Sequence, residues 1–131
     1  MVEPLTLSNP KLMNALNAQF ASRRQKDWLE SVYEEILARV DEPTLVVSDI
    51  ARAVFVSERQ FYRRLKKLTG MTPNELIQQM RMEQAYKIIN AQKYDSVAVV
   101  AKAVGFLSPD YFSLLFERHY GIRPTALLNR A

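Results

Sequence analysis

The chain has 131 residues, enough for one compact domain or two very small ones, and its 48% hydrophobic and 24% charged residues are ordinary for a globular protein. It has no cysteine, which excludes disulfides, zinc–thiolate sites and cysteine nucleophiles. The net charge of +4 divides into −1 over residues 1–41 and +5 over residues 42–131, so the later part carries the positive field expected of a region that meets a polyanion.

The spacing of apolar residues and the presence of only three glycines predict an all-α fold with about seven helices and no strand. Residues 1–25 are expected to form a linker, with a short helix after Pro10 and a solvated basic cluster, "SRRQK", at its end. From Lys26 to Val40 apolar side chains recur every four residues, which predicts an amphipathic helix that "DEP" terminates.

Start and stop signals predict six further helices. Serines at 57, 96 and 108 are expected N-caps, "TPNE" at 72–75 is a capping box, and glycines follow two of the helices. The helices are expected at about residues 47–54, 58–68, 73–91, 97–104 and 109–120, with a short last one from residue 124.

One stretch of the sequence occurs twice in similar form. "IARAVFVSERQFYRRL" at 50–65 matches "VAKAVGFLSPDYFSLLF" at 100–116, first with an offset of 50 and then, after one inserted residue, with an offset of 51. Two copies are too few for a solenoid, which needs at least three. Each copy predicts a short helix, a tight turn and a longer helix with a polar face, which is a helix-turn-helix.

The residues inside each copy suit that unit. Ala51 and Ala101 are small enough to let two helices cross closely, while Phe61 and Phe112 with their apolar neighbours supply the wedge between the helices. A glycine at 105 can take a positive φ in the turn without penalty. Phe55 stands at the equivalent position, so the first turn either carries mild strain or has a different shape.

The stretch "SVAVVAKAVGFLSPDYFSLLFERHYGIRP" resembles the signature of AraC/XylS-type transcription regulators, and the resemblance covers roughly residues 28–128. "SERQFYRRLKKLTGMTPNELI" is similar to the first helix-turn-helix of the members fused to two-component signalling modules. The resemblance implies two subdomains, residues 26–70 and 93–131, joined by a linker helix over residues 71–92. It also implies that two recognition helices enter successive major-groove segments of double-stranded DNA, about 34 Å apart.

The resemblance places Arg59, Tyr62 and Arg63 of the first recognition helix in base-reading positions. Arginine can bond guanine O6 and N7 together, whereas basic residues nearby on the helix are better suited to phosphates. The alternative for "RRLKK" is a solvated basic face. The phosphate contacts expected on this helix are Arg64, Lys66 and Lys67.

Matching positions in the second recognition helix assign base contacts to Asp110, Ser113 and Leu114. Asp110 can accept from cytosine N4, and Leu114 can meet a thymine methyl group. The resembled family often has a polar residue where Leu114 stands and lysine at Glu117, so we expect the first subdomain to supply most of the specificity. Outside the first recognition helix, phosphate contacts are expected from Arg52, Arg81, Lys102, Arg118 and Arg123.

No nucleophile–base pair, clustered carboxylates or glycine-rich phosphate loop is apparent, so neither an enzyme nor a metal or cofactor site is expected. The expected protein is a soluble, cytoplasmic and monomeric domain without membrane contact. The resemblance implies the C-terminal effector domain of a larger regulator, mostly an activator, with an upstream sensor or receiver module and RNA polymerase as a further partner. The competing hypothesis is a degenerate double helix-turn-helix that binds protein, through exposed Leu114 and Leu107.

Overall fold

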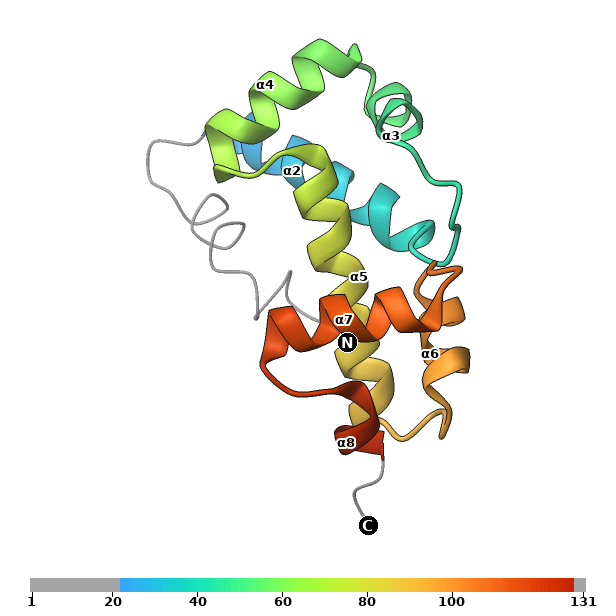
Figure 1. Cartoon of the computed structure of the whole chain (residues 1–131). Coiled ribbons are helices and arrows are strands. Elements are labelled where there is room, and N and C mark those ends of the chain that lie inside the picture. Colours follow the sequence, from blue (N-terminus) through green and yellow to red (C-terminus); the bar gives the residue numbers. More distant parts are fainter. Residues whose placement is uncertain (1–21, 129–131) are drawn as a thin grey trace. The chain divides into compact units, whose positions relative to one another are not determined.

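The computed structural model describes residues 22–128, and within that range the chain forms seven helices and no strand (Figure 1). The prediction of an all-α fold is confirmed. The short helix expected after Pro10 lies outside the described residues. The helices are α2 (Arg23–Ala38), α3 (Val47–Ala53), α4 (Glu58–Thr69), α5 (Pro73–Asn90), α6 (Val97–Ala103), α7 (Pro109–Tyr120) and α8 (Pro124–Leu128).

The helices belong to two compact units, each with its own apolar core. The first contains α2, α3, α4 and α5 up to Met80; the second contains Val40–Thr44, α5 from Arg81, and α6 to α8. Helix α5 therefore supplies core side chains to both units, whereas the sequence predicts it as a separate linker. Its buried apolar positions are 76, 77 and 80 in the first core and 82, 85 and 89 in the second.

The first core lies between α2, α3, α4 and the start of α5. Phe61 and Leu65 of α4 are fully buried, as their spacing predicts, and Ala51 of α3 is 1% exposed. Helix α3 packs on both α2 and α4. Trp28 of α2 meets the ring of Phe61 edge-on, with 5.8 Å between the ring centroids. The polar side of α4 is consequently left to solvent.

The second core is built around aromatic rings. Phe112 and Phe116 of α7 are fully buried, and their ring centroids are 5.7 Å apart. Phe106 packs on Phe112 at 5.4 Å and Tyr120 on Phe116 at 4.8 Å, so the rings form a continuous row along the inner side of α7. Helices α6 and α8 both pack on α7.

The helix starts follow their capping residues. The Ser57 hydroxyl accepts a hydrogen bond from the Gln60 amide, and the Ser108 hydroxyl accepts one from the Tyr111 amide, both at 3.1 Å. The predicted Thr72–Glu75 capping box is confirmed by its two reciprocal bonds, which open α5.

Helix α2 starts three residues earlier than the sequence suggests. Ser22 and Gln25 also form a capping box, with bonds of 2.8 and 3.1 Å between side chains and backbone amides. The "SRRQK" cluster thus forms the cap and first turn of a helix. The helix also ends at Ala38, two residues before the predicted Val40, which is buried in the second unit.

The two helix-turn-helix turns have the same backbone shape. Val54 has φ −105° and ψ 18°, and Val104 has φ −111° and ψ 20°. The next residues, Phe55 and Gly105, have φ values of +62° and +87°. The first turn therefore keeps the common shape and Phe55 carries the strain of a left-handed backbone.

The turn also identifies the inserted residue. The Val56 amide donates to the Ala51 carbonyl at 3.0 Å, and the Phe106 amide donates to the Ala101 carbonyl at 2.9 Å. Phe106 is therefore the counterpart of Val56, and Leu107 is the residue without a counterpart in the first copy.

Candidate nucleic-acid interface

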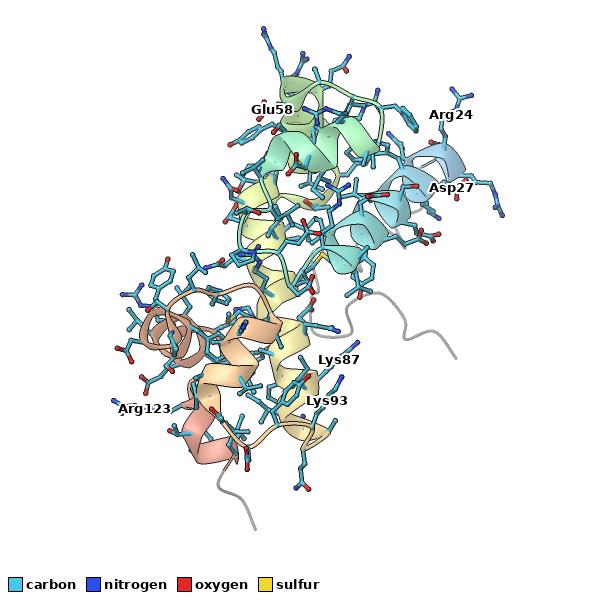
Figure 2. The ribbon with its side chains drawn as sticks, turned by 90° about the vertical axis from the view of Figure 1, so that its right-hand side faces the viewer. Arg24, Asp27, Glu58, Lys87, Lys93 and Arg123 are labelled. Carbon is cyan, nitrogen blue, oxygen red and sulfur yellow. The ribbon has the colours of Figure 1, made fainter. Side chains whose placement is uncertain are left out.

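Helix α4 exposes a strongly basic side. Its only acidic residue, Glu58, lies in the first turn, where it suits the positive end of the helix dipole (Figure 2). The predicted base contacts Arg59, Tyr62 and Arg63 are all exposed, Tyr62 by 48%. Arg59 and Arg63 are one helical turn apart, on the side away from the buried residues of α4. The structure makes these side chains accessible, and their contacts with bases stay a prediction.

Gln60, Arg63, Arg64 and Lys67 line a shallow, open groove on the same helix. Sequence reasoning did not single out Gln60, although its place three residues after an N-cap serine is a capping signal. Its side-chain oxygen accepts a hydrogen bond from the Ser57 amide at 3.1 Å, which orients the side chain at the start of the helix.

Two of the α4 cations expected to bind phosphate have partners within the protein. The guanidinium carbon of Arg64 lies 5.6 Å from the ring centroid of Trp28, a cation–π distance. Lys66 donates from Nζ to the Gly70 carbonyl at 3.1 Å and so caps the C-terminal end of α4. Both side chains are exposed, so neither partner removes the charge from the surface.

Helix α7 presents a different surface. Asp110 is exposed, Leu114 is 46% exposed, and Ser113 is half-buried. Leu107 and Tyr111, which were not predicted base contacts, are 86% and 52% exposed. Tyr111 corresponds in the register of the two copies to Gln60 of α4, which sequence reasoning also did not single out. The exposed side of α7 is therefore mainly apolar and acidic.

Four further cations expected to bind phosphate lie outside α4. Arg118 on α7 and Lys102 on α6 are exposed in the second unit, and Arg52 on α3 is exposed in the first unit. Arg123 forms a 3.5 Å ion pair with Glu117, but its side chain is 73% exposed and extends into solvent (Figure 2). All four remain accessible to a polyanion.

The prediction that Arg81 contacts phosphate is wrong, because the side chain is buried. Only 9% of the residue is exposed, because its guanidinium is held inside the second unit. Nη2 donates to the Glu42 carbonyl at 2.8 Å and Nη1 to the Gly105 carbonyl at 3.5 Å, while Cζ lies 5.8 Å from the Phe106 ring centroid. Burial lowers the pKa of Arg81 from its ordinary value. Its charge is used within the fold and not at the surface.

Neither a metal-ligand cluster nor a membrane-spanning helix occurs in residues 22–128. These residues contain no group of three or more histidine, cysteine or acidic side chains that could hold a metal ion. None of the helices described is long and apolar enough to cross a membrane.

A family model described as a helix-turn-helix domain matches residues 50–130 of the chain. Among solved structures, the chain is similar to the DNA-binding domain of AdpA, a global transcriptional factor, in complex with a target DNA. The sequences are 31% identical and the TM-score is 0.68. The match covers 76% of this chain and 87% of the AdpA domain in that structure.

Two curated relatives are much longer than the region they share with this chain. The transcriptional activator RhaS of Escherichia fergusonii is 31% identical over 97 residues, covering 74% of this chain and 32% of RhaS. Histidine kinase P4 of Formosa agariphila is 33% identical over 75 residues, covering 57% of this chain and 5% of the kinase. The chain thus spans a third or less of the length of these relatives.

Proposed function

Because the chain belongs to the helix-turn-helix family of AraC-type DNA-binding domains of transcription regulators, we propose that it binds double-stranded DNA sequence-specifically in the major groove. The observation that carries the proposal is the exposed side of α4. Five basic side chains and one acidic one lie between its capping residues Ser57 and Gly70, while its apolar side is buried. The neighbouring structure of AdpA with target DNA supports the same function.

Each of the two recognition helices contacts its own half-site. Helix α4 supplies Arg59 and Arg63, which can each bond guanine O6 and N7, and Tyr62 beside them. Helix α7 offers Asp110, Ser113 and Leu114 to a second half-site about 10 bp away, one turn of the double helix. Phosphate contacts fix the register on DNA without reading sequence. The residues proposed for them are Arg52, Arg64, Lys66, Lys67, Lys102, Arg118 and Arg123.

The wider role extends this proposal to a larger protein. The chain acts as the DNA-binding effector of a cytoplasmic regulator that activates transcription, receives its signal from a sensor or receiver module, and meets RNA polymerase. Two similarities support this role: one relative is a transcriptional activator and the other a histidine kinase, and both are longer than the shared region.

A second candidate function is protein binding. It is favoured by the apolar exposed side of α7, where Leu107 is 86% and Leu114 46% exposed. In that case DNA binding would be the weak, salt-sensitive association of any basic protein.

Selection of bound duplexes from a random pool at about 150 mM salt tests the proposal, since that salt concentration suppresses purely electrostatic binding. We expect an enriched motif with two half-sites, one of which is relaxed by Arg63→Ala. Lys67→Ala is the matched control, because it should weaken binding equally to all sequences. No enriched motif with the wild-type chain would exclude sequence-specific binding and favour the protein-binding candidate.

A further inference from the structure

The exposed side of α7 is centred on an apolar residue. Leu114 lies two residues from both Phe112 and Phe116, which are fully buried, so at about 100° per residue it points to the opposite side of the helix. Tyr111 lies on the same broad side, 52% exposed, and Leu107 precedes the helix cap, 86% exposed. Large apolar side chains left in water at a binding surface indicate a partner with apolar groups.

The register between the two recognition helices shows how far α7 departs from α4. Leu114 stands where α4 has Arg63, and Asp110 stands where α4 has Arg59. The N-caps, the glycine C-caps and the turn backbones of the two copies agree, so corresponding residues occupy corresponding places on the two helices. At the two positions where α4 has the arginines proposed to read bases, the α7 side chains therefore offer no hydrogen-bond donor.

The chemistry of the major groove limits what such a surface can read. The thymine C5 methyl group is the apolar feature of base edges there, whereas guanine presents two acceptors. Asp110 is also an acceptor, so it disfavours guanine and suits the amino group of cytosine or adenine. We propose that α7 reads its half-site mainly through thymine methyl groups, which Leu107, Tyr111 and Leu114 contact.

This inference rests on the proposed function and deepens it, because it assigns a base preference to one half-site. We take DNA as the partner of this surface because it lies on the recognition helix of the second helix-turn-helix, where the exposed cation Arg118 accompanies the acidic Asp110 and Glu117. Arg118 lies one helical turn after Leu114 on the same helix, and Lys102 is exposed on α6. In such a complex the cations can neutralise the phosphates on either side of the thymine methyl group that the apolar side chains contact.

Deoxyuridine substitution tests the inference, because deoxyuridine pairs with adenine as thymine does but lacks the methyl group. Within the selected duplex, each thymine of the α7 half-site is replaced in turn and the Kd is measured at about 150 mM salt. We expect each contacted methyl to be worth about fourfold in Kd, which is ~0.8 kcal/mol for one buried carbon group. Thymines of the α4 half-site serve as the control, and their replacement should leave the Kd unchanged.

Protein variants assign the effect to the residues. Leu114→Ala should abolish the sensitivity to deoxyuridine at one position, whereas Arg63→Ala should leave that sensitivity intact. A selected motif whose α7 half-site is indifferent to deoxyuridine overturns the inference and leaves the proposed function standing. The absence of any selected motif overturns both.

Discussion

The guanidinium of Arg81 in α5 donates a hydrogen bond from Nη2 to the carbonyl oxygen of Glu42, 39 residues earlier in the chain, at 2.8 Å. The same group reaches the Gly105 carbonyl and lies over the ring of Phe106. Arg81 thus ties the Val40–Thr44 segment and the second helix-turn-helix turn to α5. Arg81 and Glu42 belong to the same compact unit, so this contact holds that unit together internally.

Replacement of Arg81 should lower stability without changing the electrostatic part of DNA binding. Arg81→Met keeps the length of the side chain but leaves the carbonyls of Glu42 and Gly105 without their charged donor. We expect a loss of roughly 1.5–3 kcal/mol in the free energy of unfolding, measured by urea denaturation.

The matched control is Arg52→Met, at an exposed position. It should change stability by less than about 0.5 kcal/mol. It should also reduce the slope of log K against log salt by about 0.9, as the loss of one phosphate contact does. Equal stability of the two variants, or a reduced salt slope for Arg81→Met at wild-type stability, would contradict the structural role of Arg81.

Exchange of the residue with a positive φ should change stability in opposite directions in the two turns. Phe55→Gly removes the strain of φ +62° at a side chain that is 94% exposed, so we expect a net gain of about 0.5–1 kcal/mol in stability. Gly105→Ala would place a Cβ 2.5 Å from the Val40 carbonyl oxygen and 3.1 Å from Cζ of Arg81. Thermal denaturation should show a loss of at least about 2 kcal/mol for this variant.

The two variants should differ in stability because the two turns leave different amounts of space for a side chain. A Cβ at residue 105 meets backbone and the buried Arg81, whereas the Phe55 side chain extends into solvent. Destabilisation by Phe55→Gly would mean that the phenyl ring makes a favourable contact that its exposure does not reveal.

The fold was largely predictable because its signals are local. N-cap serines, a proline at the first helical position and glycine C-caps mark five of the seven described helices within a residue or two. The start of α2 was missed, although "SRRQ" carries the same capping-box pattern as "TPNE". The burial of Arg81 has no local signal, since its partners lie 39 and 24 residues away in the sequence.

The candidate interface was predictable to the extent that it follows from the buried residues. The spacing of Phe61 and Leu65 fixes which side of α4 is exposed, and the exposures of Arg59 and Arg63 follow from it. The cation–π partner of Arg64 could not be predicted, because it depends on how α2 packs against α4. Leu107 was identifiable as exposed and apolar, but its place as the inserted residue required the backbone bonds of the two turns.

Trp28 should report on the engagement of Arg64 with DNA. It is the chain's only tryptophan, and the Arg64 guanidinium lies 5.6 Å from its ring centroid. When Arg64 turns to a phosphate, the surroundings of the indole change. We expect DNA binding to alter tryptophan fluorescence in the wild type and not in Arg64→Ala, which should also lower the salt slope by about 0.9.

Lys67→Ala is the control for this experiment, because Lys67 is an exposed cation of the same helix without an aromatic partner among the described contacts. It should reduce the salt slope similarly but keep the fluorescence change. If Arg64→Ala retains both the slope and the signal, Arg64 serves only to cover Trp28.

Tyr120 should make the chain sensitive to alkaline pH. Its hydroxyl is buried without a hydrogen-bond partner among the described residues. Burial raises the pKa of Tyr120 well above its ordinary value of 10.0, and Glu83 and Tyr86 raise it further. Above pH 10 the unfolded chain can release this proton while the folded chain holds it, so stability falls as pH rises through that range.

Tyr120→Phe isolates that effect, because phenylalanine keeps the aromatic contact with Phe116 and removes the hydroxyl. At about pH 7 we expect the variant to be as stable as the wild type or slightly more so, since no bond is lost. At about pH 10.5, where free tyrosine ionises, urea denaturation should show a smaller loss of stability for the variant than for the wild type. A marked destabilisation at neutral pH would instead mean that the hydroxyl is hydrogen-bonded in solution, and equal losses at high pH would mean that Tyr120 ionises normally in the folded chain.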